Sequence, residues 1–227
     1  MKKLQVVFLI LMGLALLGMS MPSPSQAIIM VTTRAGIMQT DYTDWGQFGP
    51  QFTTVPSGSV ATSNGGGVLT TVSTSGMADM YIYIQSSGWA GNFSPGDNLL
   101  WTGSNDDSLI LQFSKGLAGV GAQVQRDYYY GFTGTIQAYG STNNLLGTFT
   151  EAGYSDGAAD NSAIFLGVRD STADIFKIVY TVSGTSGLGF AINQLAMSNI
   201  PVPLPPSVLL LGSGLLGLLG LRRFRKH

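Results

Sequence analysis

Cysteine is absent from this 227-residue chain, and its single histidine, His227, is the last residue. Without cysteine the chain forms no disulfide, no thiolate metal site and no cysteine nucleophile. Without an internal histidine it has no Ser-His-Asp triad, no histidine general base and no histidine-bound zinc or iron. Several large classes of enzymes and metalloproteins are therefore excluded at the outset.

Charge is also scarce, at 10% of the residues, and it is unevenly placed. Six of the 11 basic residues lie at the two ends of the chain. The stretch 28–199 holds the other five and all 12 acidic residues, so its formal charge is 5 − 12 = −7. An acidic body does not bind nucleic acid through counterion release, and we expect no nucleic-acid partner. The basic clusters at the two ends instead indicate segments that enter a membrane, because positive flanking residues stay on its cytoplasmic side.

The N-terminal segment has the three parts of a secretory signal peptide. Lys2 and Lys3 form a positive start, residues 6–17 form an uncharged apolar run, and Ser25 and Ala27 occupy the −3 and −1 positions of a cleavage site. This order predicts a signal peptide over residues 1–27, removed by signal peptidase after Ala27. The alternative is an uncleaved anchor helix, but the run is short for a bilayer span of about 20 residues.

The C-terminal segment, residues 200–227, also has three parts. A proline-rich stretch over residues 200–206 precedes an uncharged run over residues 208–221, which is rich in leucine and glycine, and an arginine cluster follows. The run predicts a short transmembrane helix of about 22 Å at 1.5 Å per residue. Snorkelling arginines and local thinning can match such a helix to a hydrocarbon core of about 30 Å. The positive end should stay in the cytoplasm, with the body outside it.

This order of proline motif, short helix and arginine cluster resembles the PEP-CTERM sorting signal of Gram-negative bacteria, in its Val-Pro-Leu-Pro version. The residues that carry the resemblance are Val202, Pro203, Leu204, Pro205, Pro206, Arg222, Arg223 and Arg225. It implies recognition by an exosortase, a membrane transpeptidase-like protease. The body would pass through an inner-membrane intermediate to the cell surface or the extracellular matrix, where family members are associated with polysaccharide and biofilm. The alternative is a plain C-terminal tail anchor.

The body, residues 28–199, shows the pattern of an all-β domain. Glycine, serine, threonine and asparagine separate short runs of β-branched and aromatic residues, and no long 3.6-residue period occurs. The pattern predicts one antiparallel β-sandwich domain, in the form of a jelly roll. It also resembles the lectin-like sandwich modules often found ahead of this sorting signal. The clearest predicted strands are 81–85, 108–113, 119–126, 133–139, 145–150, 162–168, 175–182 and 190–197; weaker ones are 29–33, 51–55, 68–72 and 99–101.

Aromatic side chains in glycine-rich segments are the candidates for ligand binding. A loop tryptophan beside asparagine and aspartate can stack on a sugar ring while the polar groups bond its hydroxyls. The candidate residues are Trp45, Trp89, Asn92, Phe93 and Trp101. The alternative is that the loop tryptophans fold back and cap the sandwich, because aromatic side chains usually bury most of their area. Tyr128, Tyr129 and Tyr130 alternate across a strand end, so one or two of the three should face solvent.

Acidic loops are the candidates for calcium binding, since Ca²⁺ takes oxygen ligands. The candidate ligands are Asp106, Asp107, Asp156 and Asp160. No EF-hand spacing is present, and aspartate and asparagine are also common turn formers, so the turn interpretation stands beside the calcium hypothesis.

No catalytic motif is present in the sequence: there is no phosphate loop, nucleophile elbow or cofactor fingerprint. We therefore predict an exported, non-enzymatic surface or matrix protein whose β-sandwich binds polysaccharide. One alternative is a secreted polysaccharide-active enzyme that uses paired aspartates, because glycoside hydrolysis needs two facing carboxyl groups. Another is a structural matrix protein that self-associates through its sheet edges.

Overall fold

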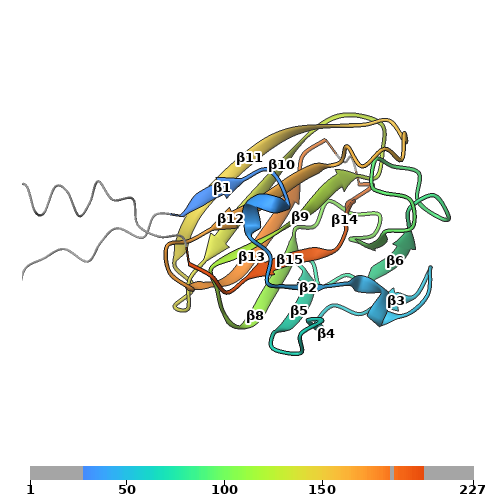
Figure 1. Cartoon of the computed structure of the whole chain (residues 1–227). Coiled ribbons are helices and arrows are strands. Elements are labelled where there is room, and N and C mark those ends of the chain that lie inside the picture. Colours follow the sequence, from blue (N-terminus) through green and yellow to red (C-terminus); the bar gives the residue numbers. More distant parts are fainter. Residues whose placement is uncertain (1–27, 185–186, 202–227) are drawn as a thin grey trace, which may run out of the picture.

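Two antiparallel β-sheets packed face to face make up the body of the protein (Figure 1). The computed structural model describes residues 28–184 and 187–201. The expected signal peptide, residues 1–27, and the sorting motif with its helix and arginine cluster, from residue 202 onward, lie outside the described residues. Within the described ranges, no helix has the length and apolarity needed to cross a bilayer.

The first sheet, called sheet A here, has nine strands. Its main path runs through β1 (Ile29–Val31), β12 (Ile164–Arg169), β9 (Gly119–Arg126), β14 (Phe190–Ile192), β7 (Asn98–Trp101), β6 (Met80–Ile84) and β3 (Thr54–Val55). Beside this path, β15 (Leu195–Ser198) pairs with β9 and with β2 (Asp41–Thr43). Two short 3-10 helices, η2 (Ala35–Ile37) and η3 (Trp45–Phe48), flank β2 in the sequence.

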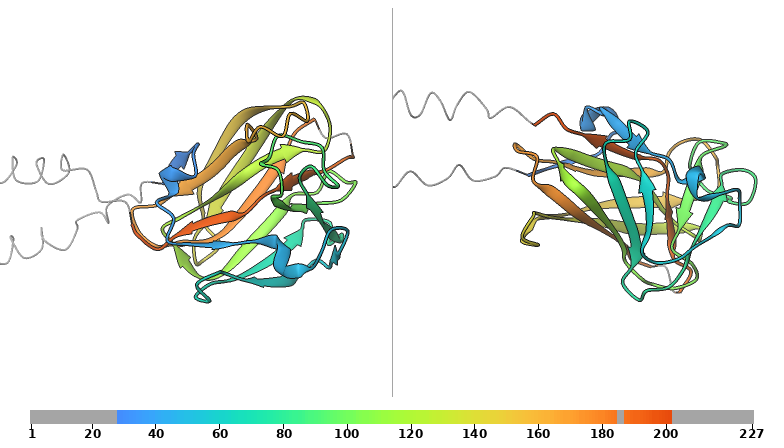
Figure 2. Two further views of the ribbon diagram at one scale, coloured as in Figure 1. Left: turned by 45° about the vertical axis from the view of Figure 1, so that its right-hand side comes forward. Right: turned by 90° about the horizontal axis from the view of Figure 1, so that it is seen from below.

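The second sheet, called sheet B, has six strands. Their order is β11 (Leu145–Ser155), β10 (Tyr130–Tyr139), β13 (Ile175–Val182), β8 (Leu109–Leu117), β5 (Leu69–Thr74) and β4 (Ser59–Thr62). Every strand pair in both sheets is antiparallel, and the two sheets are seen facing each other in Figure 2. The predicted all-β antiparallel sandwich is therefore confirmed.

The main core lies between the sheets because each strand presents alternate side chains inward. On β13, Ile178, Tyr180 and Val182 are buried, while Lys177 and Thr181 lie on the other face and are more exposed. The Tyr180 hydroxyl crosses the core, donating to the Leu166 carbonyl at 2.8 Å and accepting from the Ala122 amide at 3.1 Å. One side chain of sheet B thus bonds two strands of sheet A.

The strand limits predicted from the sequence are right for some strands and wrong at the β-bulge before the last strand. The limits of β9 and β13 agree with the sequence analysis. The predicted single strand 190–197 is wrong, because it divides into β14 and β15. Ile192 pairs with Val124, but Ala196 pairs with Gly121, so the segment between them contains one extra residue, which is a β-bulge. Two strands, β2 and β4, were not predicted.

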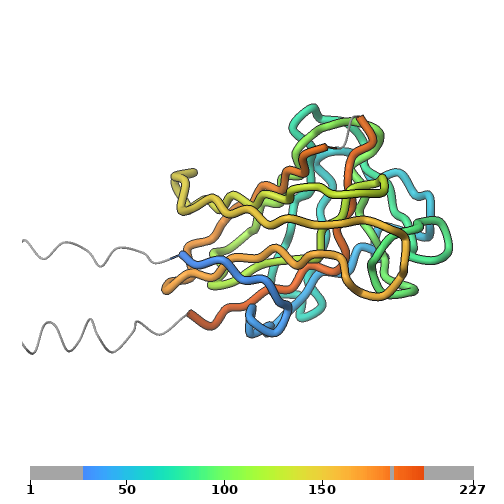
Figure 3. Tube along the Cα trace, turned by 90° about the horizontal axis from the view of Figure 1, so that it is seen from above, coloured from blue at the N-terminus to red at the C-terminus, as the bar shows by residue number. Residues whose placement is uncertain are grey.

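The described ends of the chain lie at one end of the sandwich, and two loops that matter below lie at the other. Ile29 pairs with Arg169 and Ser198 pairs with Gly119, so both described ends of the chain lie at the Gly119 end of β9 (Figure 3). The loop after β6 and the turn between β9 and β10 lie at the opposite end. An eight-residue strand at about 3.4 Å per residue separates the two ends by roughly 25 Å.

Candidate functional site

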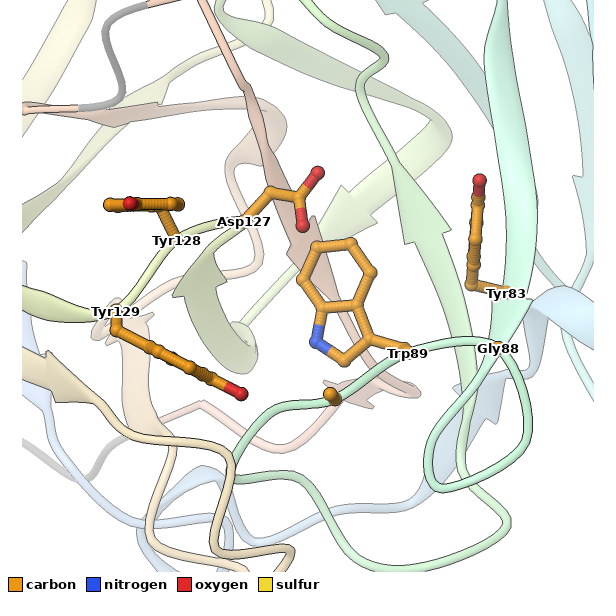
Figure 4. A pocket seen from close by; sticks show the side chains of 7 residues that line it. Tyr83, Gly88, Trp89, Asp127, Tyr128 and Tyr129 are labelled. Atoms are coloured by element: carbon orange, nitrogen blue, oxygen red, sulfur yellow. The ribbon is translucent and has the colours of Figure 1, made fainter.

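A cavity of about 350 Å³ opens at the end of the sandwich that lies away from the chain ends. It is formed by β6, the loop that follows β6, and the turn between β9 and β10. We call it the aromatic cleft, and Figure 4 shows the side chains that line it: Tyr83, Gly88, Trp89, Ala90, Asp127, Tyr128 and Tyr129.

One wall of the aromatic cleft is built around Trp89. A tight turn holds the residue, because the Trp89 amide donates to the Ile84 carbonyl at 3.1 Å and the Trp89 carbonyl accepts from the Ser86 amide at 2.9 Å. Its ring lies edge to face against Tyr83 at 5.9 Å and against Trp101 at 6.5 Å. These contacts fix the indole, which is only 6% exposed. Among the described residues, its Nε1 has no hydrogen-bond partner.

The facing wall is made of tyrosines from the turn after β9. Tyr128 and Tyr129 are 54% and 46% exposed, and their rings stack with centroids 6.5 Å apart. Behind them, the buried guanidinium of Arg126 lies 5.8 Å from the Tyr128 ring centroid and donates to the Gly131 carbonyl at 3.1 Å. A cation held over a ring stabilises it. Both tyrosines are therefore accessible to a ligand, and the contact with Arg126 holds the Tyr128 ring in place.

Asp127 supplies a carboxylate between the two aromatic walls (Figure 4). Burial raises the pKa of Asp127 to about 6. Burial, followed by the nearby Asp127 charge, also raises the pKa of Tyr83. At neutral pH the cleft thus has one partly desolvated carboxylate, an acceptor of hydrogen bonds, beside the exposed rings of Tyr128 and Tyr129. Such a site suits a ligand with both apolar C–H faces and hydroxyl donors.

The structure places the five predicted ligand residues in different environments. Trp89 lines the cleft, and Trp101, which is half-buried, packs behind Trp89 and Tyr83. Trp45 and Phe93 are fully buried, so the prediction that they contact a ligand is wrong. Trp45 belongs to the main core and donates from Nε1 to the Asn193 carbonyl at 2.7 Å. Trp45 is thus buried, as the alternative interpretation of the tryptophans expected.

Asn92, the fifth predicted ligand residue, is 2% exposed and acts within the fold. Its Nδ2 donates to Asp156 at 2.6 Å and to Asp160 at 3.4 Å, so the two carboxylates come together. Its Oδ1 accepts from Gln125 at 2.9 Å and from the Asp156 amide at 3.0 Å. Asn92 therefore ties the loop after β6 to the loop between β11 and β12, and a ligand cannot reach it.

The structure gives each of the four predicted calcium ligands a hydrogen-bond partner within the fold. Asp156 accepts from the Ala158 amide and Asp160 from the Ser162 amide, as in Asx turns. The Ser162 hydrogen bonds also lower the pKa of Asp160. Asp106 accepts from the Gly187 amide and Asp107 from the Ser75 hydroxyl, in another loop. The described residues contain no group of three or more acidic or other ligating side chains placed around a metal position.

A polar cavity of about 230 Å³ lies on the outer face of sheet A. Asn193, the residue at the β-bulge, bonds three of the side chains that line it. Its Nδ2 donates to Asp97 at 2.9 Å and to Gln123 at 2.6 Å, and its Oδ1 accepts from Arg34 at 3.1 Å. Burial lowers the pKa of Arg34, and the nearby Asp97 charge opposes this shift. These side chains bond mainly to one another, so we interpret them as a structural network that joins segments distant in sequence.

Comparisons with known proteins show no family for this chain. No family model matches it, and no curated protein matches it. Among solved structures, the module CsCBM6-3 from Clostridium stercorarium, in complex with cellobiose, is 12% identical and covers 66% of this chain and 95% of its own, with a TM-score of 0.32. A DUF4465 family protein from Bacteroides caccae is 11% identical and covers 76% and 100%, with a TM-score of 0.37.

A family 6 carbohydrate-binding module from Clostridium cellulolyticum, in complex with xylose, is 20% identical and covers 65% of this chain and 97% of its own, with a TM-score of 0.31. Identities and TM-scores at this level assign neither a family nor a ligand. The function of this chain is therefore argued from its own residues.

Four side chains that line the aromatic cleft, those of Tyr83, Asp127, Tyr128 and Tyr129, were not predicted as site residues. Tyr83 belongs to a strand and reaches the cleft because its side chain points to the outer face of sheet A. Asp127 is one of twelve acidic residues, and no local pattern distinguishes it from the others. The tyrosine triplet beside it was the available signal, and all three of its members are exposed.

Proposed function

We propose that this chain is a non-catalytic, exported surface or matrix protein that binds polysaccharide through the aromatic cleft. The observation that carries the proposal is the cleft itself, in which aromatic rings from two walls face a single carboxylate. Sugar rings present C–H groups on their faces and hydroxyls at their edges. Aromatic rings pack on the first, and a carboxylate accepts hydrogen bonds from the second.

The geometry of the cleft favours binding over hydrolysis. Glycosidases need two carboxyl groups that face each other, about 5 to 9 Å apart, across the scissile bond. Asp127 is the one carboxyl group among the residues that line the cleft. Asp156 and Asp160 do lie near each other, but on a turn outside the cleft and with hydrogen bonds to Asn92. The alternative of a paired-aspartate enzyme therefore has no support in this cavity.

Export is supported by the sequence pattern at both ends of the chain, and the position of the cleft suits it. Residues 28 and 201 lie at one end of the sandwich, and the cleft lies roughly 25 Å away at the other end (Figure 3). A body held to a membrane or cell wall through its C-terminal segment would direct the cleft outward. That orientation suits a receptor for polysaccharide in the surrounding matrix.

The proposal is tested with a glycan array that contains neutral and acidic polysaccharides, probed with the full chain in mild detergent. We expect selective binding that is lost in Tyr128→Ala and is unaffected by a calcium chelator. The matched control is Tyr139→Ala, which removes a tyrosine at the far end of β10. If the full chain binds no glycan on the array, or if Tyr128→Ala binds as well as the control, polysaccharide binding through this cleft is refuted.

A further inference from the structure

A second cavity, of about 360 Å³, adjoins the aromatic cleft. Gly88, Trp89 and Ala90 line both cavities, so this short segment forms their common wall. We call the second one the Gln85 cavity, and its remaining lining residues are Gln85, Ser86, Ser87, Gly157 and Ala159. Each volume lies near the lower limit of ligand pockets, about 300 Å³, so each cavity alone holds only a short ligand.

The side chain of Tyr129, which lines the aromatic cleft, lies against Gly157, which lines the Gln85 cavity. A Cβ atom placed on Gly157 would lie 2.8 Å from the Tyr129 hydroxyl oxygen, so this tyrosine of the aromatic cleft reaches the loop that lines the Gln85 cavity. The same loop is bonded to the common wall, because the Ala159 amide donates to the Gly91 carbonyl at 2.8 Å. The two cavities thus meet where Trp89 and Tyr129 lie.

Two buried polar atoms at this junction have no hydrogen-bond partner among the described residues. One is the donor Nε1 of Trp89, and the other is the acceptor Oε1 of Gln85, whose residue is 2% exposed. Gln85 is otherwise anchored, since its Nε2 donates to the Gly91 carbonyl at 2.7 Å. Most buried polar atoms are paired, so these two unpaired atoms distinguish the residues that line the two cavities.

Charge limits the class of glycan that the two cavities can take. No lysine or arginine is among the residues that line either cavity, and Asp127 is the one charged side chain among them. The nearest cation, Arg126, is 8% exposed and bonds to the Gly131 carbonyl behind the Tyr128 ring. A uronic acid or sulfated sugar would place its negative charge near Asp127 without a compensating cation.

We propose that the aromatic cleft and the Gln85 cavity form one groove that holds consecutive sugars within an uncharged polysaccharide chain. This rests on the proposed function and specifies its ligand. One sugar stacks between the walls of the aromatic cleft, and the following sugars lie beyond Trp89 against the small residues of the Gln85 cavity. Recognition then depends on the length of the oligosaccharide, and a single sugar fills only half of the groove.

The first test is a length series measured by isothermal titration calorimetry on the full chain. The probes are neutral β-1,4-linked oligomers of glucose, xylose and mannose, from one to six units, with oligogalacturonate of the same lengths as the acidic counterpart. We expect at least one neutral series to bind, with affinity at least tenfold higher for the six-unit oligomer than for the single sugar. The acidic series should bind at least tenfold more weakly than that neutral series.

The second test uses the absence of native cysteine. The variant Ser87→Cys places one thiol in the exposed rim of the Gln85 cavity, and labelling with a bulky maleimide then fills that cavity. Ser141→Cys, at the exposed turn between β10 and β11, is the matched control. We expect the label at position 87 to remove the gain with length while the affinity for the single sugar changes less than twofold. The same label at position 141 should change neither value.

The outcomes separate this inference from the proposed function. If glycans bind but affinity does not rise with length, or if the labelled Ser87→Cys variant keeps the gain, the extended groove is refuted while polysaccharide binding stands. The same holds if glycans bind on the array but no neutral series does, or if oligogalacturonate binds more tightly than every neutral series. If no glycan of any kind binds, the proposed function itself fails.

Discussion

Replacing Asp127 with asparagine should stabilise the protein at neutral pH and weaken its binding of glycans. Burial raises the pKa of this carboxyl from 3.8 to about 6. The folded protein therefore binds more protons than the unfolded chain between these two pH values, and its stability falls as the pH rises through this window. The contribution of protonated Asp127 to the free energy of unfolding is fully present below pH 3.8 and is lost above about pH 6. Asparagine keeps the shape of the side chain and removes the charge.

The size of the effect follows from the shift and from the exposure of the carboxyl. A shift of about two pKa units corresponds to about 3 kcal/mol if the charge is fully buried. The side chain is half-buried and borders an open cavity, so solvent screening reduces this to about 1 kcal/mol. We expect Asp127→Asn to be more stable than the unaltered protein by about 1 kcal/mol at pH 7.5. At pH 3.8 and below, the difference should vanish.

The assay is urea denaturation of both proteins at half-unit pH steps from 3.5 to 8, followed by tryptophan fluorescence. Binding of a neutral glycan at pH 7.5 is measured on the same samples. A stability difference that stays constant across the pH range would contradict the account of Asp127, as would a variant that is less stable at pH 7.5. We expect Asp127→Asn to be more stable and to bind the glycan more weakly, because a residue needed for function often lowers the stability of the fold.

Three further predictions concern the core, the polar network and the chain ends. Tyr180→Phe should lower the free energy of unfolding by about 1–3 kcal/mol, measured by urea denaturation, because it removes the hydroxyl that bonds β9 and β12. Asn193→Ala should lower it by about 2–4 kcal/mol in the same assay, since four side-chain hydrogen bonds are lost and their buried partners stay unpaired; a change below 0.5 kcal/mol would contradict the structural role of the network. Mass spectrometry of the protein from its native host should give an N-terminus at Ile28 and a C-terminus near residues 202–206; a C-terminus at residue 227 would indicate a permanent anchor.

The fold was predictable because most strands bury one face or both and are bounded by turn residues. β9 and β13 could be delimited to the residue, since glycine and charged residues mark their ends. The break between β14 and β15 could not be predicted. The extra residue there is set by pairing with β9 and by the side chain of Asn193, which bonds groups far away in the sequence. The residues next to Asn193 in the sequence do not indicate which distant residues it will bond.

The candidate site was predictable only in part, and the errors have a common cause. Trp45, Trp89 and Phe93 all lie in glycine-rich segments, and from the sequence each looks like an exposed loop aromatic. Packing decides between them. Trp45 enters the main core, whereas Phe93 and Trp89 belong to a smaller cluster on the outer face of sheet A, and of these two only Trp89 lines the cleft. Tyr83, on β6, and Asp127, on the turn after β9, are distant in sequence, so tertiary structure alone brings them together.

The most direct test of polysaccharide binding in the aromatic cleft is one calorimetric comparison. It measures the affinity of the full chain and of Tyr129→Ala for the neutral glycan that binds best on the array. Tyr129 is 46% exposed, so its removal should leave the circular dichroism spectrum and thermal stability unchanged. The account predicts binding by the full chain and an affinity at least tenfold lower in the variant, which is about 1.4 kcal/mol. Equal affinities in two equally folded proteins would show that the glycan binds elsewhere.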